Sequence, residues 1–326
     1  MAQVTVVVPN WNRRELLEAL LGRLARQTCP ASEAIVVDNG SADGSAGAAR
    51  KLGATVIEFA ENRGFAAAVN TGIRACRTEL VAVVNNDVEP ESDWLERSQD
   101  ALEENREAWF AAGKILDASH PDRLDGTWDL VSRGGCAWRS GHGRSNGEAW
   151  SRPRRIRFAP WTATLFRRSL FEEAGWLDER FESYLEDVEF GLTCARAGLG
   201  GVFVPQARAL HRGSATLGQW HPEVVRRIAR NQLLLVAKHF PERWWLRYGW
   251  PVLAGQLLWG LVALRHGAGR AWLRGKAEGV RRFGEFRRPL SAGTLEDALL
   301  ESEREIFEQQ KATGFDAYWR LYFALT

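Results

Sequence analysis

The segment Val4-Thr5-Val6-Val7-Val8-Pro9-Asn10-Trp11-Asn12 decides the fold class of this chain of 326 residues. Its first five residues form a short apolar run rich in β-branched side chains, which is typical of a buried parallel strand. Further runs of this kind follow, separated by stretches with a helical pattern. The runs are Ala34–Val37, Ala54–Phe59 and Leu80–Val84, and the helical stretches are Arg14–Gln27, Ser45–Leu52 and Phe65–Cys76.

This alternation of strands and helices predicts a doubly wound α/β sheet. In such sheets a ligand binds beyond the carboxyl ends of the strands. The predicted strands all stop in polar, turn-forming segments, namely Pro9–Asn12, Asp38–Ser41, Glu61–Gly64 and Asn85–Asp87. We therefore expect a ligand site where these segments meet. The pattern G-x-G-x-x-G does not follow the first run, which argues against a dinucleotide-dependent oxidoreductase.

The pattern changes twice further along the chain. Residues 108–215 contain strand-like pieces separated by longer loops, and the loop Gly134–Ser151 is long enough to be a binding element. After Pro222 the pattern is helical, and the expected helices are Val224–His239, Trp244–Leu264, Ala271–Phe283 and Leu295–Gln310. We expect one domain over 1–222, with halves 1–107 and 108–222, and a helical lobe over 223–326.

The charge distribution bears on the partners of this chain. The net charge of +2 and the lack of a recognised motif argue against nucleic acid. Arginines and tryptophans nevertheless crowd the last third. Trp244–Leu264 has about the length of a membrane span, but Arg247, Pro251 and Gln256 interrupt it. An interfacial helix on an anionic membrane is favoured over a span, a soluble core helix or a dimer helix, because tryptophans prefer the headgroup level.

The cysteines and the N-terminus indicate a cellular compartment. The four cysteines lie far apart without a C-x-x-C pair, which argues against a zinc site or a disulfide framework and favours a reducing cytoplasm. The N-terminal apolar run is short and no basic segment precedes it, so we interpret it as a strand and not as a signal peptide.

Several side chains are suited to chemistry. Asp87 follows a predicted strand and offers the hard oxygen ligands that suit Mg²⁺ or Mn²⁺, and Asp38 can accept a hydrogen bond from a pyrimidine base. Glu186 and Asp187 begin a predicted helix, where a carboxylate can accept a proton from a hydroxyl. His211 follows an apolar run and is a candidate metal ligand. For the acids, turn formation or helix capping is the structural alternative.

The order of these motifs resembles family 2 of the glycosyltransferases, and within it the bacterial rhamnosyltransferases. The resemblance covers residues 3–240 and depends on Val8–Asn12, Asp38–Ser41, Asn62–Asn70, Asn85–Asp87, Glu186-Asp187 and His211-x-x-Ser214. It implies the GT-A nucleotide-diphospho-sugar transferase fold, which is a Rossmann-like mixed α/β sheet flanked by helices, here with a C-terminal helical extension. Residues 1–107 are then the nucleotide-binding half, and residues 108–222 are the acceptor-binding half.

The resemblance also implies roles for single residues. Asp187, with Glu186 beside it, is the expected general base, and both acids with Trp161 are expected to contact the acceptor, although Trp161 can equally belong to the core. Asp87 is the expected ligand of Mn²⁺ or Mg²⁺, and His211 is expected to contact the metal or the diphosphate. The residues expected to contact the nucleotide sugar are Pro9, Asn10, Asn12, Asp38, Asn62, Arg63, Gly64, Asn70, Asn86 and Asp87.

One departure from the family pattern concerns the D-x-D element. Asn85 stands where the family has its first acid, so a charge is lost and the metal affinity is expected to be modest. This N-N-D form is common in the rhamnosyltransferase branch and favours dTDP-L-rhamnose as the donor. UDP-galactofuranose, UDP-N-acetylglucosamine and GDP-mannose stay open as donors.

The reaction implied by the resemblance is an inverting transfer. An acceptor hydroxyl gives its proton to Asp187 as it attacks the sugar, and the nucleoside diphosphate leaves from the opposite face with its charge neutralised by the metal. The expected acceptor is a glycan or a polyprenyl-diphosphate-linked sugar in cell-wall or surface-polysaccharide synthesis. The expected location is cytoplasmic, peripheral on the inner face of the membrane, and a homodimer through the helical lobe stays open.

The sequence argues against two other functions. A catalytically inactive scaffold that binds nucleotide sugars predicts the loss of Asp87, Asp187 or His211, and all three are present. A sugar-1-phosphate nucleotidyltransferase requires a glycine-rich triphosphate loop after the first strand, and residues 9–14 contain no glycine.

Overall fold

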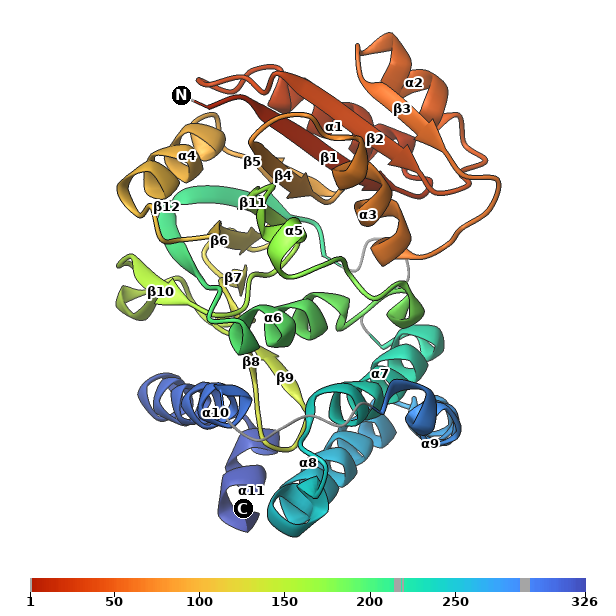
Figure 1. Cartoon of the computed structure of the whole chain (residues 1–326), viewed down its shortest axis with the longest axis vertical. Coiled ribbons are helices and arrows are strands. Elements are labelled where there is room, and N and C mark those ends of the chain that lie inside the picture. Colours follow the sequence, from red (N-terminus) through yellow and green to blue (C-terminus); the bar gives the residue numbers. More distant parts are fainter. Residues whose placement is uncertain (1, 214–217, 219, 288–293) are drawn as a thin grey trace. The chain divides into compact units, whose positions relative to one another are not determined.

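The chain folds into two compact units, which are distinguished here by their main element (Figure 1). The computed structural model describes residues 2–213, 218, 220–287 and 294–326. The sheet unit comprises Met1–Trp128, Gly141–Cys194 and Leu199–Thr216, and the helical unit comprises Asp129–Ser140, Ala195–Gly198 and Leu217–Thr326. The two units are not continuous in sequence, and the segment Gly134–Ser151, expected to be one long loop, is divided between them.

Ten strands of the described residues form one mixed sheet in the sheet unit. Its order is β10-β12-β6-β11-β4-β1-β2-β3, with β5 paired to β12 and β7 paired to β6. Strands β1 to β4 run parallel, whereas β11 runs antiparallel to both β4 and β6. The strands are β1 (Val4–Asn10), β2 (Glu33–Asp38), β3 (Thr55–Glu58), β4 (Leu80–Val84), β5 (Val88–Pro90), β6 (Phe110–Asp117), β7 (Leu124–Gly126), β10 (Arg154–Ile156), β11 (Ala163–Arg167) and β12 (Gly201–His211).

Helices flank this sheet and seal its core. The helices of this unit are α1 (Arg14–Leu24), α2 (Ser45–Lys51), α3 (Phe65–Ala75), α4 (Trp94–Glu104), α5 (Leu170–Glu173), α6 (Glu186–Arg196) and the 3-10 turns η1 (Glu148–Trp150) and η2 (Glu179–Phe181). Helix α3 lies close against β1, because a Cβ on Gly72 would stand 2.3 Å from a methyl of Val7. The alternating valines of β1 and the leucines of α1 are buried together in the core.

The helical unit contains five helices among its described residues and a two-stranded hairpin. They are α7 (Pro222–His239), α8 (Trp244–Arg265), α9 (Gly269–Phe286), α10 (Thr294–Thr313), α11 (Ala317–Leu325), β8 (Asp129–Val131) and β9 (Ala137–Arg139). Helices α7 and α9 pack closely, since a Cβ on Gly275 would lie 2.2 Å from the Arg226 carbonyl oxygen. In the described part of the chain, none of the helices combines the length and the apolar character that crossing a bilayer requires.

Polar contacts tie the hairpin to the helices of this unit. The Arg133 guanidinium pairs with Glu303 on α10, and the Tyr322 hydroxyl of α11 donates to the same carboxylate at 2.8 Å. On α8, the Gln256 amide donates to the Gly134 carbonyl at 2.8 Å. Because these partners are buried and mutually satisfied, residues 129–140 are held firmly within the helical unit.

Candidate active site

Three strand ends of the sheet unit are joined by amide side chains. The Asn10 amide donates to one oxygen of Asp38 at 2.9 Å, in line with the pairing of these two residues across β1 and β2. Asn86, just after β4, donates to the Asn10 amide oxygen at 2.7 Å. The structure therefore brings together three of the predicted nucleotide-sugar contacts at the carboxyl edge of the parallel strands, where ligands bind in such sheets.

The turn after β1 is locked to the turn after β2. The Asn12 amide N–H donates to the Ser41 hydroxyl at 2.7 Å, and the Asn12 side chain accepts from the Ala42 N–H at 3.0 Å. Ser41 in turn donates its backbone N–H to Asp38 at 3.1 Å. Asp38 is buried and organises both turns, a structural role that stands beside its predicted contact with the nucleobase. Pro9 precedes this arrangement on β1 and is partly exposed.

Asn39 holds the loop Asn62–Gly64 against the same edge, a role that the sequence analysis missed. Its amide donates to the Asn62 side chain at 3.1 Å and to the Gly64 carbonyl at 3.0 Å, and its oxygen accepts from the Arg63 N–H at 2.8 Å. The approach requires Gly40, whose φ is +76° and whose added Cβ would lie 2.7 Å from the backbone of Glu61. The motif Asp38–Ser41 thus builds a backbone cradle as well as offering an acid.

The same loop contacts the turn that precedes α6. Gly64 has a φ of +88°, and a Cβ there would stand 2.8 Å from the Glu182 carbonyl oxygen. That oxygen accepts from the Ala66 N–H at 3.1 Å, and the Ser183 hydroxyl accepts from the Phe65 N–H at 3.2 Å. The predicted donor loop and the turn before the predicted base are therefore in direct contact.

The turn before α6 has an unusual backbone. Glu182, Tyr184 and Leu185 have φ angles of 64°, 72° and 66°, in the left-handed region that residues with a side chain seldom adopt. Backbone strain of this kind is concentrated at functional sites. This turn leads directly into the first turn of α6, which contains Glu186 and Asp187. Negative charge is favourable at the N-terminus of a helix. Glu186 is buried, whereas Asp187 is partly exposed and is the more accessible of the two acids.

His211 lies between two carboxylates. Strand β12 pairs His211 with Val88 of β5, which places the imidazole beside Asp87. The His211 Nε2 atom is 3.2 Å from Asp87 Oδ1, and Nδ1 is 2.9 Å from Oδ2 of Asp125 on β7. All three side chains are at most 16% exposed. The predicted pair of metal ligands is brought together, and Asp125 is a third member that the sequence analysis missed.

The two acids change the protonation of this histidine. Burial by itself lowers the pKa of His211, but the hydrogen bonds and charges of Asp125 and Asp87 outweigh burial and raise the pKa to about 9. The metal-free imidazole therefore carries both protons at neutral pH. A cation that binds Nε2 must displace one of them, so metal binding at this site is linked to proton release.

Asn85 contributes an unmet acceptor at the same strand end. Its backbone N–H donates to the Thr162 carbonyl at 2.9 Å, but its side-chain oxygen is buried and has no hydrogen-bond partner among the described residues. Such an atom is costly to leave unpaired.

Two of the predicted ligand contacts, Asn70 and Trp161, are buried and have partners within the protein. Asn70 donates to the Leu177 carbonyl at 2.9 Å and to Glu179 at 3.0 Å and accepts from the Leu177 N–H at 3.1 Å, so its buried amide ties α3 to the chain before α6. Trp161 is 3% exposed and packs on an aromatic cluster formed by Phe166, Phe171 and Phe190. The structure gives Trp161 the core placement that the sequence analysis left open, and Asn70 a structural role.

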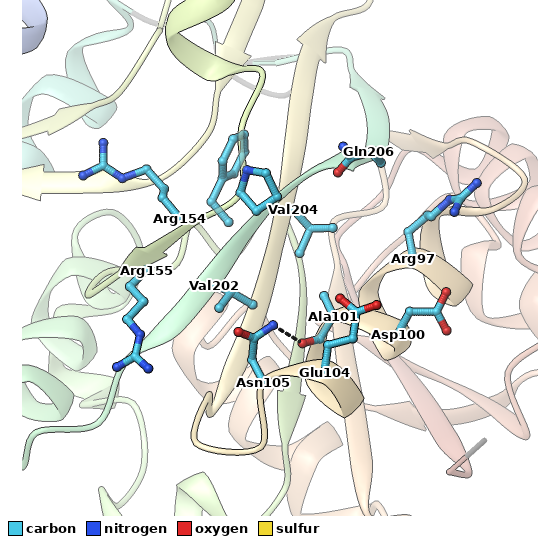
Figure 2. A pocket seen from close by; sticks show the side chains of 12 residues that line it. Arg97, Asp100, Ala101, Glu104, Asn105, Arg154, Arg155, Val202, Val204 and Gln206 are labelled. Atoms are coloured by element: carbon cyan, nitrogen blue, oxygen red, sulfur yellow. Dashed lines mark hydrogen bonds between the residues drawn. The ribbon is translucent and has the colours of Figure 1, made fainter.

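A hollow of about 350 Å³ lies elsewhere in the sheet unit, between α4 and strands β10 and β12 (Figure 2). Arg97, Glu104, Arg154 and Val202 are among its lining residues. None of the candidate residues lines it. The candidate site is therefore defined by its side chains at the strand ends and not by this hollow.

Comparison with known proteins decides the family. The model of glycosyl transferase family 2 matches residues 5–175. The chain belongs to this family. A curated relative from Mycobacterium tuberculosis, N-acetylglucosaminyl-diphospho-decaprenol L-rhamnosyltransferase, is 28% identical over 244 residues, covering 66% of this chain and 77% of the relative. The pre-mycofactocin glycosyltransferase of the same organism is 29% identical, covering 67% of this chain and 44% of that protein.

Solved structures confirm the predicted GT-A fold of the transferase. The mannosyltransferase PcManGT from Pyrobaculum calidifontis, in complex with GDP-Man and Mn²⁺, superposes with a TM-score of 0.54 at 19% identity, covering 99% of this chain and 86% of that one. GalNAc-T7 with UDP, GalNAc and Mn²⁺ superposes with a TM-score of 0.60 at 12% identity, covering 87% and 56%. Both of those structures contain Mn²⁺.

The donor set at Asp87 and His211 fits such a cation. Within the ranges that the structure describes, no group of three or more His, Cys, Asp or Glu side chains is placed to hold a metal. Two protein ligands, with diphosphate and water completing the shell, are usual for Mg²⁺-type sites. Asp87 Oδ1 and His211 Nε2 lie 3.2 Å apart as an ion pair, so the two side chains are close enough to bind one cation when the proton between them is lost.

Asp125→Asn is expected to weaken Mn²⁺ binding in the presence of donor by about 10- to 100-fold, because Asp125 orients the His211 ring through Nδ1. Electron paramagnetic resonance titration measures the Mn²⁺ affinity. Nitrogen-15 NMR of the metal-free protein, which reports the protonation of the two ring nitrogens, checks the imidazole independently of turnover.

The matched control for this variant is Asp122→Asn, which changes an exposed acid three positions away. It should bind Mn²⁺ as the wild type does. An Asp125→Asn variant with wild-type Mn²⁺ affinity and an unchanged imidazole spectrum would show that Asp125 does not position His211.

Proposed function

We propose that this family 2 transferase moves L-rhamnose from dTDP-L-rhamnose to an acceptor hydroxyl with inversion at the anomeric carbon. The proposal depends above all on one observation, the pairing of Asp87 with His211 at 3.2 Å beside the linked strand ends. That pairing supplies an oxygen and a nitrogen ligand at the edge where a nucleoside diphosphate binds in sheets of this kind.

Asp87 and His211 would hold a Mn²⁺ or Mg²⁺ ion, with Asp125 orienting the imidazole. When bound, the cation supplies positive charge that stabilises the departing diphosphate. Asn10, Asn12, Asp38 and Asn86 form the polar edge that receives the nucleoside, as their mutual hydrogen bonds support. The backbone of the loop Asn62–Gly64, held by Asn39, borders the same edge.

Asp187 would accept the proton of the acceptor hydroxyl. It is the accessible acid of the pair at the start of α6, and the turn before it contacts the predicted donor loop. A carboxylate within hydrogen-bond reach of the hydroxyl is sufficient for general-base catalysis. One such base serves one displacement, and a single displacement inverts the configuration, whereas an inverting glycosidase needs two carboxyl groups.

The donor and acceptor are supported by the relatives and by the sequence. The name of the mycobacterial relative specifies an L-rhamnosyl group and a diphospho-decaprenol acceptor. The N-N-D form of residues 85–87 accords with a rhamnosyl donor. We propose a glycan or polyprenyl-diphosphate-linked acceptor in cell-wall or surface-polysaccharide synthesis, at the cytoplasmic face of the membrane. UDP-galactofuranose, UDP-N-acetylglucosamine and GDP-mannose are the competing donors.

Calorimetric titration with dTDP-rhamnose, the UDP-sugars and GDP-mannose, each with Mn²⁺ and with chelator, tests this proposal without an acceptor. Binding of dTDP-rhamnose that requires Mn²⁺ is the expected result. Preference for a UDP- or GDP-sugar would overturn the donor assignment and keep the reaction class. Failure of every nucleotide sugar to bind the folded protein would overturn the transferase proposal, and binding without any hydrolysis or transfer would favour an inactive scaffold.

A further inference from the structure

The outward face of α8 is apolar over nearly its whole length. Seven large apolar side chains on this helix are between 50% and 74% exposed, and six of them share one face: Leu246, Trp250, Leu253, Leu257, Leu261 and Leu264. We name these six the α8 stripe. In the sheet unit, by contrast, the exposed large apolar side chains are scattered along the chain, namely Trp11, Leu52, Trp176 and Tyr184. A continuous exposed stripe of this kind marks an interaction surface.

Helical geometry shows that the stripe is one narrow, continuous face. At 100° per residue its six members fall within an arc of about 80°. From Leu246 to Leu264 the stripe is about 27 Å long at 1.5 Å per residue. Residues 248–264 contain no Asp, Glu, Lys or Arg. The opposite face, with Tyr248, Val252 and Leu258, is buried in the helical unit.

Cations border the stripe at both ends, and a tryptophan borders it at the N-terminal end. Arg243 and Arg247 are exposed at its N-terminal end, together with Trp245, and Arg247 also forms an ion pair with Glu296 of α10. Arg265 follows its last member directly and is exposed too. The surrounding segment, residues 243–287, holds nine Lys or Arg against two Glu. An apolar face with tryptophan at the end and arginines along the border is the composition of helices that lie in a membrane interface.

We propose that the α8 stripe docks flat on an anionic lipid surface, with its leucines among the upper acyl chains and the bordering arginines on the headgroups. Charge decides between lipid and a second copy of the chain, since a second copy brings an equally basic border and like charges repel. Anionic headgroups attract the same border. Because the described helices lack the properties of a membrane span, the stripe lies along the surface.

Docking through this surface would bring the enzyme to a lipid-linked acceptor. Only this biological purpose rests on the proposed function. The docking itself needs neither donor nor acceptor. It can therefore fail while the transferase proposal holds, and the reverse is also true.

Vesicle co-sedimentation of the full chain tests the proposal. One set of vesicles contains phosphatidylcholine alone, and the other contains equal amounts of phosphatidylcholine and phosphatidylglycerol. The salt concentration is about 0.1 M, at which the Debye screening length is about 10 Å. The wild type should bind the anionic vesicles and leave the neutral ones largely free. Leu253→Gln/Leu257→Gln/Leu261→Gln should lower the partition coefficient by about 100-fold, because three apolar side chains no longer enter the lipid.

The control is Leu52→Gln, which makes the same change at a similarly exposed leucine of the sheet unit and should bind vesicles as the wild type does. Circular dichroism checks that the triple variant keeps its helices. We expect that it does, because glutamine is a good helix former. Light scattering gives the mass in solution. If the wild type does not bind anionic vesicles, the proposal is overturned. If the wild type is a dimer and the triple variant is a monomer, the stripe is the interface with a second copy.

Discussion

The Asp187→Asn variant is expected to bind donor and Mn²⁺ as the wild type does and to lose transfer by about 10³-fold or more. Asparagine keeps the size and polarity of the side chain at the start of α6, so the left-handed turn before it has no reason to change. It cannot accept the proton of the acceptor hydroxyl, however. Single-turnover measurement of sugar transfer, beside calorimetry of donor binding, separates the chemical step from binding.

The neighbouring acid provides the comparison for this variant. Glu186 is buried, so Glu186→Gln should reduce transfer far less than Asp187→Asn does. If the two losses were reversed, Glu186 would be the base. Turnover of Asp187→Asn within about tenfold of the wild type, well below the usual contribution of a general base, would remove Asp187 from the role.

Asp87→Asn is expected to abolish the Mn²⁺-dependent part of donor binding and to lower kcat/KM by about 10³-fold. The variant removes the charged ligand of the cation, and metal stabilisation of a leaving group contributes several kcal/mol to such a reaction. Because Asn85 already lacks a charge, Asp87 is the only acid of the N-N-D segment. Calorimetric titration of donor with Mn²⁺ and with chelator measures the loss.

Asp93→Asn is the matched control, since Asp93 lies close in sequence but pairs with the exposed Arg97 on α4. It should leave the dependence on Mn²⁺ unchanged. Donor binding by Asp87→Asn that still responds to Mn²⁺ as the wild type does would place the cation on other ligands and would contradict the proposed site.

The fold was predictable where its signal is local. Val4–Val8 and Leu80–Val84 are apolar β-branched runs, and both form strands of the sheet. Strand β12 is longer than its apolar start suggests, because it continues through an irregularity between Val204 and Arg208 to reach His211. Pro205 interrupts the sequence pattern there, so the extent of this strand depends on pairing with β6 and β5, which a local pattern does not contain.

The site was predictable where residues belong to motifs. Asp87 and His211 were expected to meet, and they do. Asp125 was not expected, because it lies 86 residues from His211 in a stretch with no motif of its own. Asn70 has a structural role that its motif did not indicate, since its side chain forms hydrogen bonds with the backbone of Leu177. A polar residue's partners are set by tertiary contacts, so its type and position in sequence do not separate the two roles.

The contact between Gly64 and Glu182 has a consequence for how this enzyme can change. The loop that borders the donor and the strained turn that presents Asp187 share a backbone hydrogen bond and leave no room for a side chain. Under the roles proposed above, a substitution at this contact is expected to change donor binding and the rate of proton transfer to Asp187 together.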